Sequence, residues 1–269
     1  MIVALILCDR TAPVADGQAA YFLPLGEESV IERIAGTVLR GPFGGAIVMA
    51  APVHAVALQE QLQGFAVQHL EARSAGAGPH AALAEALAAA EKFRARWEKA
   101  MAAAAARFGG ADDVGDEEAP SRRGNAPVKD GGKKAPWTRH RKSADVKIRG
   151  LARSFERDGV IVFRGERPGI GLELQAHLVD AFGREGEARG DAARPFARPV
   201  CAGQHGYPLV LSVVGAREVG ALPPSTDLEA WLAQRPECMQ EIPVDDSGAI
   251  ESLDDARAYS SIRQRLERD

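Results

Sequence analysis

The predicted fold rests on two stretches near the N-terminus, Ile2-Val-Ala-Leu-Ile-Leu7 and Phe22-Leu-Pro-Leu-Gly26-Glu-Glu-Ser-Val-Ile-Glu-Arg-Ile34. The first is an unbroken apolar run rich in β-branched residues, which is typical of a strand buried on both faces of a parallel sheet. In the second, Ser29, Val30, Ile31 and Ile34 open a helix with one apolar stripe. A buried strand, a loop and an amphipathic helix in this order predict the first βα unit of an α/β domain.

Strand and helix patterns continue to alternate along the 269 residues. This alternation predicts a mostly parallel sheet with helices on both faces, and therefore one three-layer α/β/α domain spanning 1–269. Further strands are expected at 45–51, 65–70, 159–163, 207–213 and 239–242, and helices at 53–62, 80–108, 148–157, 170–182 and 252–267.

Residues 109–147 interrupt this pattern with an acidic run, then a basic run, and almost no large apolar side chains. Such a segment cannot bury enough apolar area to offset its ordering entropy, so we predict a charged, disordered insertion. The basic run around Trp137 could contact nucleic acid or an acidic partner. Its composition favours a solvated segment.

Charge and hydropathy exclude several classes of function. The net charge of −4 argues against whole-surface binding to nucleic acid or to an anionic membrane. The longest apolar runs have the length of strands, so no membrane span is expected. The chain starts directly in a strand with no basic leader, and its three cysteines are few and far apart. These features predict a cytoplasmic protein without a signal peptide.

The strand, the loop after it and the Leu23-Pro-Leu-Gly26 motif resemble the start of the molybdenum-cofactor (MobA-like) nucleotidyltransferases and their nucleotide-sugar relatives. The resemblance covers 1–92 and 158–269. It implies a nucleotide-diphospho-sugar transferase fold. It also implies transfer of a nucleotidyl group from an NTP, either CTP or GTP, to a phosphorylated acceptor such as molybdopterin, with Mg²⁺ as cofactor.

The phosphate-binding loop departs from the family pattern. In that family the loop is rich in glycine, carries an Arg and ends in a Lys, whereas here Gly17 is the single loop glycine and Ala20 stands in place of the Lys. The resemblance implies nucleotide contacts at Leu7, Cys8, Asp9 and Arg10, and base contacts at Gly78, Pro79 and His80. Two readings without a ligand stay open: a buried apolar Cys8, and a turn that needs Gly78-Pro79 only to start a helix.

Metal and acceptor sites are implied in the same way. Glu166 lies in Gly165-Glu-Arg-Pro168, where the family has Gly-Asp-x-Pro, and Glu251 takes the place of the second family Asp near the C-terminus. Both are predicted Mg²⁺ ligands. The alternatives are an exposed loop carboxylate for Glu166 and a capping box formed by Ser252 and Asp255 beside Glu251. The acceptor site is expected at His205, Gly206 and Tyr207.

Two functions therefore remain open from the sequence. One is a working nucleotidyltransferase in which Arg10 supplies part of the missing positive charge. The other is a catalytically inactive relative that binds a nucleotide, a cofactor precursor or a partner protein. The loss of the Lys, of several glycines and of both Asp identities favours the second on chemical grounds.

Overall fold

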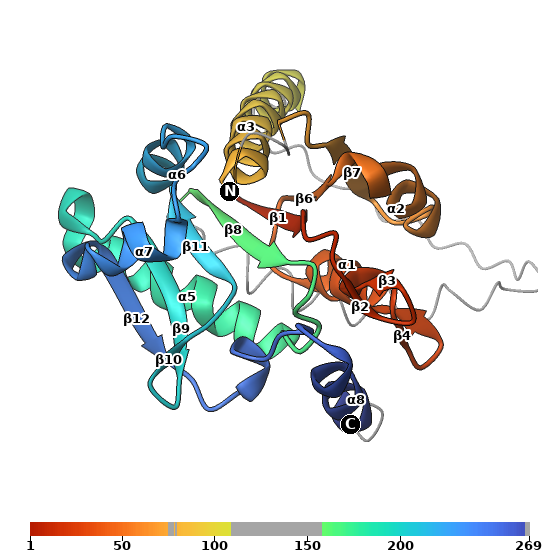
Figure 1. Ribbon diagram of the computed structural model, residues 1–269. Coiled ribbons are helices and arrows are strands. Elements are labelled where there is room, and N and C mark those ends of the chain that lie inside the picture. The colour runs from red at the N-terminus through yellow and green to blue at the C-terminus, as the bar shows by residue number, and fades with distance from the viewer. Residues whose placement is uncertain (75–77, 79, 109–157, 267–269) are drawn as a thin grey trace, which may run out of the picture.

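An eight-stranded sheet forms the centre of the protein (Figure 1). The computed structural model describes residues 1–74, 78, 80–108 and 158–266. The predicted insertion at 109–147 and the predicted helix at 148–157 lie outside these residues. Seven strands follow the order β10-β9-β11-β8-β1-β6-β7, and β12 pairs with β9. The strands are β1 (Ile2–Cys8), β6 (Gly45–Ala50), β7 (Val67–Glu71), β8 (Gly159–Arg164), β9 (Phe196–Cys201), β10 (Gln204–His205), β11 (Leu209–Ser212) and β12 (Met239–Pro243).

Helices cover both faces of this sheet (Figure 1). Even-numbered residues of β1, such as Ile6, pack in one core with four helices: α1 (Val30–Arg40), α2 (Ala55–Gln61), α5 (Leu172–Arg189) and α8 (Ala256–Leu266). Odd-numbered residues, such as Leu5, pack in a second core with α3 (Ala81–Phe108), α6 (Val213–Gly220) and α7 (Leu228–Ala233). The alternation follows from the two-residue period of a strand. The predicted three-layer α/β/α arrangement is confirmed.

The sheet is parallel around β1 and antiparallel towards one edge. Ile6 pairs with Val48 of β6 on one side and with Phe163 of β8 on the other, both in parallel register. The chain leaves β1 towards β6 and β7, then returns to the opposite side of β1 as β8. This reversal opens a crevice beyond the carboxyl ends of β1 and β8, where open α/β sheets bind their ligands.

Several element boundaries differ from the sequence prediction. The helix expected at 170–182 spans Leu172–Arg189, so it continues through residues that were expected to lie outside it. The helix expected from Val53 begins at Ala55, after a 3₁₀ turn at Pro52–His54. The helix expected from residue 252 begins at Ala256, because Asp255 caps it by accepting the Ala258 amide at 2.8 Å. Asp255 therefore performs the capping that the sequence assigned to a Ser252–Asp255 box. The capping box that the structure contains joins Ser29 and Glu32 at the start of α1.

None of the described helices is both long enough and apolar enough to pass through a bilayer.

Candidate functional site

A cleft of about 710 Å³ opens at the carboxyl ends of β1 and β8. Its walls come from segments that are far apart in the sequence: the end of β1, the start of α3, the end of β8 and the region around α7. Seven of the residues predicted to form the site line this one cleft: Leu7, Asp9, Arg10, His80, Glu166, His205 and Tyr207. The shared rim follows from the fold, since the Gly165 amide bonds to the Leu7 carbonyl at 2.8 Å.

The loop between β1 and α1 folds on itself as a β-hairpin. Strands β2 (Pro13–Ala15) and β3 (Gln18–Ala19) pair antiparallel, and the turn residues Asp16 and Gly17 both have positive φ, at 52° and 74°. Two positive φ values are what a two-residue type I′ hairpin turn requires. The single loop glycine therefore serves the turn.

Ala20, which stands where the family has Lys, follows the hairpin directly in a 3₁₀ turn (Ala20–Phe22). Ala20 is only 3% exposed and belongs to the core that lies against α1. This position therefore faces the interior and is not part of the cleft lining.

Arg164 is the central charge of the cleft, and the sequence analysis did not single it out. Its Nη2 lies 3.0 Å from Asp9 Oδ1, and its Nε donates to Glu166 Oε1 at 3.1 Å. Burial of the guanidinium lowers the pKa of Arg164, but Glu166 and Asp9 together raise it further, so the net shift is upward. A permanently charged Arg164 thus holds both carboxylates in place.

Arg10 makes a second bridge between the first loop and the same carboxylate. Its Nε lies 3.3 Å from Glu166 Oε1, and its Nη1 lies 2.6 Å from Asp254 Oδ1. The Arg10 side chain is 56% exposed, whereas that of Glu166 is 3% exposed. Arg10 is therefore the accessible member of the pair and can turn towards a ligand.

The two predicted metal ligands differ in what they offer. Glu166 Oε2 is buried and has no hydrogen-bond partner among the described residues, so it fits one ligand position on a divalent ion that arrives with nucleotide phosphates. Glu251 is engaged on both oxygens, by Ser247 Oγ at 2.8 Å and by an ion pair with Arg265. Within the described ranges, no three His, Cys, Asp or Glu side chains cluster in a way that could hold a metal. A metal at Glu251 would have to displace Arg265.

Cys8 is fully buried beneath the rim, and a Cβ on Gly165 would lie only 2.8 Å from its Sγ. Burial, with smaller effects from Glu166 and Asp9, raises the pKa of the Cys8 thiol well above its usual value. Cys8 is therefore the buried apolar thiol that the sequence left open, and only its backbone can contribute to the cleft.

The predicted base-contact loop is held by protein contacts. A Cβ on Gly78 would lie 2.2 Å from the Pro224 carbonyl oxygen, so close backbone packing explains this glycine. His80 is 1% exposed and its Nε2 donates to the Val219 carbonyl at 2.6 Å, which ties the start of α3 to α6. Pro79 lies outside the described residues.

The predicted acceptor residues join a network of charged side chains. Arg198, 4% exposed, donates from Nη2 to His205 Nδ1 at 2.6 Å and from Nη1 to Glu229 Oε2 at 2.8 Å. His205 must then carry its proton on Nε2, which donates to Glu241 at 2.6 Å. The Tyr207 hydroxyl donates to Glu229 Oε1 at 2.9 Å.

Gly206 lies between these residues but is buried: its amide donates to the Pro199 carbonyl at 2.8 Å, and a Cβ on Gly206 would lie 2.5 Å from the Ala249 carbonyl oxygen. It therefore shapes this wall of the cleft from behind.

The sequence analysis gave no role to three charged residues that line the cleft, Arg164, Arg167 and Glu229, or to Arg198, which bonds to His205 and Glu229 behind it. Arg164 and Arg167 lie at and just after the end of β8, Arg198 lies within β9, and Glu229 lies in α7. A charge that directly ends a buried strand, as Arg164 ends β8, is the one sequence feature that could have pointed to the site.

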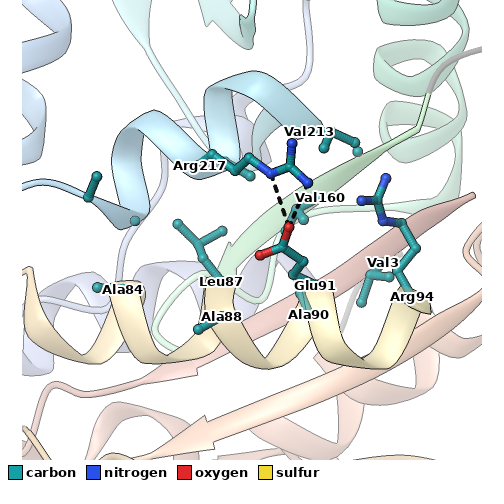
Figure 2. Close-up of a pocket in the computed structure, with 14 residues that line it drawn as sticks. Val3, Ala84, Leu87, Ala88, Ala90, Glu91, Arg94, Val160, Val213 and Arg217 are labelled. Atoms are coloured by element: carbon teal, nitrogen blue, oxygen red, sulfur yellow. Dashed lines mark hydrogen bonds and ion pairs between the residues drawn. The ribbon is translucent and has the colours of Figure 1, made fainter. Parts of the chain in front are cut away.

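A second hollow of about 280 Å³ lies between α3 and α6 at the opposite end of the sheet (Figure 2). Its floor includes Val3 and Val160, from the amino ends of β1 and β8. Figure 2 shows Arg217 reaching across it to Glu91, with Nη2 2.8 Å from Oε1. This hollow contains none of the predicted site residues, so the cleft at the carboxyl ends remains the candidate site.

No protein-family model and no curated protein matches the chain. Solved structures match along nearly all of it. The nucleotidyl transferase Mth528 from Methanothermobacter aligns with a TM-score of 0.60 at 13% identity and covers 100% of this chain and 98% of its own. Rv0371c from Mycobacterium tuberculosis H37Rv, solved in complex with manganese, gives 0.53 at 15% identity, with 100% and 98% covered.

A CMP:2-keto-3-deoxy-manno-octonic acid synthetase complexed with CTP gives a TM-score of 0.54 at 10% identity, with 99% of this chain and 98% of that chain covered. Sequence identities this low show that the fold is shared but do not show a shared activity. The chain therefore has the α/β fold that these solved structures share, as predicted from the resemblance.

Proposed function

We propose that the cleft binds a nucleoside triphosphate, CTP or GTP, and transfers its nucleotidyl group to a phosphorylated acceptor. The observation that carries this proposal is the gathering of Arg10, Arg164 and Arg167 around the carboxyl ends of β1 and β8. Arginine suits phosphate because its planar fork donates two hydrogen bonds at once. Similar folds in a nucleotidyl transferase and in a synthetase complexed with CTP agree with this substrate class.

In this reaction an oxygen of the acceptor phosphate forms a bond to the α-phosphorus of the NTP. The bond from that phosphorus to the oxygen bridging the β-phosphate breaks, and pyrophosphate leaves with the electron pair. We assign Arg10 and Arg164 to the triphosphate, together with the backbone of Leu7, Cys8 and Asp9. The base is assigned to the side of Gly78, Pro79 and His80, and the acceptor to His205, Gly206 and Tyr207.

Mg²⁺, when bound with the nucleotide, would be held by Glu166 and, after Arg265 is displaced, by Glu251, and it would neutralise phosphate charge. The manganese complex of Rv0371c supports divalent-metal use in this fold. A molybdopterin-like phosphate in the cytoplasm is the acceptor that the family resemblance favours.

One observation favours a second function, an inactive relative that binds a nucleotide or a partner. The family Lys is replaced by the buried Ala20, and the phosphate loop is closed into a hairpin. Loss of one positioned donor or cation typically slows a reaction by about 10²–10³. We therefore expect transfer to be slow even where the nucleotide binds.

Calorimetric titration with CTP, GTP and the matching monophosphates, each with Mg²⁺ or Mn²⁺, tests nucleotide binding. Pyrophosphate release with a phosphorylated pterin acceptor then separates the two functions. Binding with pyrophosphate release supports the transferase, and binding without release supports the inactive relative. If triphosphates bind no better than monophosphates, Arg10 and Arg164 do not form a triphosphate site and the proposal is wrong.

A further inference from the structure

The charged side chains of the cleft can be matched one by one with their partners. Arg164 lies between Asp9 and Glu166, at 3.0 and 3.1 Å, and Arg10 bridges Glu166 and Asp254, at 3.3 and 2.6 Å. Each of these two guanidiniums is therefore already neutralised by carboxylates when no ligand is present.

Arg167 has different surroundings. Its Nη1 donates to the Ala249 carbonyl at 3.3 Å, and its guanidinium carbon lies 5.0 Å from the centroid of the Tyr207 ring. Among the described residues, no carboxylate oxygen lies within 4.0 Å of its nitrogens, and its buried Nε has no hydrogen-bond partner. Burial lowers the pKa of Arg167 by more than the charges of Glu166 and Asp254 raise it. A partly desolvated cation with no carboxylate at ion-pair distance gains strongly from an anion that enters the cleft.

Glu229, the carboxylate that bonds to Tyr207, is already occupied by other donors. Glu229 accepts one hydrogen bond from Tyr207 and one from Arg198, at 2.9 and 2.8 Å. Burial and the nearby Glu229 raise the pKa of Tyr207, so its phenol stays protonated at neutral pH. Tyr207 is thus held as a fixed, neutral platform on which the Arg167 guanidinium rests.

We propose that Arg167, resting on Tyr207, forms a subsite for a phosphate monoester, the phosphate group of the acceptor. The assignment of the phosphate to the acceptor rests on the proposed function, whereas binding of a phosphate at Arg167 does not. Arg10 and Arg164, which pair with carboxylates at the ends of β1 and β8, are assigned to the nucleotide, and Arg167, which lies over the Tyr207 ring, is assigned to the second phosphate. Two separate cationic positions are what a reaction between two phosphorylated substrates needs.

The test is calorimetric titration of the full chain with glycerol 3-phosphate and, separately, with CTP and GTP. Arg167→Gln should weaken glycerol 3-phosphate binding by about tenfold or more, the usual effect of removing one charge-assisted contact. NTP affinity should change by less than about threefold. Arg167→Lys keeps the charge and should retain part of the binding. The matched control is Arg33→Gln, which removes an arginine on α1 that does not line the cleft and whose pair with Glu28 spans 3.5 Å.

Equal losses for glycerol 3-phosphate and NTP would assign Arg167 to the nucleotide, and no loss for either would remove the subsite. Both outcomes overturn the proposal. If Arg167→Gln does not fold, Tyr207→Leu removes the platform and keeps the guanidinium, and it must still weaken phosphate binding. Phosphate binding that survives in a protein that releases no pyrophosphate would contradict the transferase and leave the subsite intact.

Discussion

The Nε atom of Arg10 lies 3.3 Å from Oε1 of Glu166, so the loop after β1 and the loop after β8 share one ion pair. The pair joins residues that are 156 positions apart, and it exists because Leu7 pairs with Arg164 across the two strands. Arg10 is the exposed partner and Glu166 the buried one. An entering phosphate can therefore compete for Arg10 while Arg164 continues to hold Glu166.

From this relationship we expect Arg10→Ala to weaken NTP binding by about tenfold, because a charge-assisted hydrogen bond typically contributes about 1.5–3 kcal/mol. The fold should be unaffected, since the Arg10 side chain is 56% exposed. Calorimetric titration with CTP and GTP measures the change, and the surface variant Arg33→Ala is the control. An unchanged NTP affinity in Arg10→Ala would show that the triphosphate does not reach this side of the cleft.

The second prediction concerns Ala20. Ala20→Lys should not restore a phosphate-binding cation but should lower the free energy of unfolding by about 2–4 kcal/mol, because a charged chain would be forced into a packed core. The melting temperature is expected to fall by several degrees or more. The matched control is Gln18→Lys, two residues away on the exposed side of the hairpin, which should change stability by less than about 0.5 kcal/mol.

An Ala20→Lys variant with an unchanged melting temperature and tighter NTP binding would contradict this account. It would mean that residue 20 turns towards the cleft and that the hairpin opens when the nucleotide binds.

The sequence predicted the parts of the fold that depend on local patterns. Apolar runs located the strands, and the rule that parallel strands end at one rim brought Leu7 and Glu166 together. It could not predict the burial of Ala20, because nothing local distinguishes a residue that enters a 3₁₀ turn from one that faces solvent. The sequence analysis also missed Arg198. It lies in β9 next to a proline, and this strand does not have the apolar pattern of a buried strand, so nothing marked its position.

The sequence also could not predict the site's ion pairs between residues that are far apart along the chain. The sequence suggested Glu251 as a metal ligand from its position in a motif, but the structure pairs it with Arg265 one helix later. Arg164 and Arg167 gained their importance from distant neighbours, such as Asp9 for Arg164 and Tyr207 for Arg167, which only the folded chain brings close. Such contacts depend on the register and on packing, which the periodicity of a single segment does not contain.

The third prediction concerns the cysteines. Cys8 and Cys201 are buried and Cys238 is partly exposed. Because the thiolate is the reactive form, and burial raises the pKa of Cys8 well above its usual value, Cys8 should resist alkylation in the folded protein. We expect iodoacetamide to label Cys238 first and Cys8 only after denaturation, as peptide mass spectrometry would show. Rapid labelling of Cys8 in the native protein would contradict its place in the core.

The last prediction concerns the capping box that starts α1. The Ser29 side chain accepts from the Glu32 amide at 3.3 Å, and the Ser29 amide donates to Glu32 Oε2 at 2.7 Å. Burial raises the pKa of Glu32, but hydrogen bonds from Ser29 and Gln61 together lower it more, so the folded value lies below the usual 4.5. A carboxyl group with a lowered folded pKa contributes stability above its unfolded pKa, and this contribution disappears as the pH falls through the folded pKa.

Ser29→Ala should therefore lower the free energy of unfolding by about 1 kcal/mol at neutral pH, the typical value of an N-cap. The loss should shrink as the pH falls below 4.5, because protonated Glu32 no longer forms its part of the box in either protein. Urea denaturation at a series of pH values measures both effects. The control Ser260→Ala removes a hydroxyl on α8 that donates to the Ala256 carbonyl at 2.8 Å, an uncharged contact, so its effect should not depend on pH. A loss in Ser29→Ala that stays constant across this pH range would show that Glu32 does not take part in the cap.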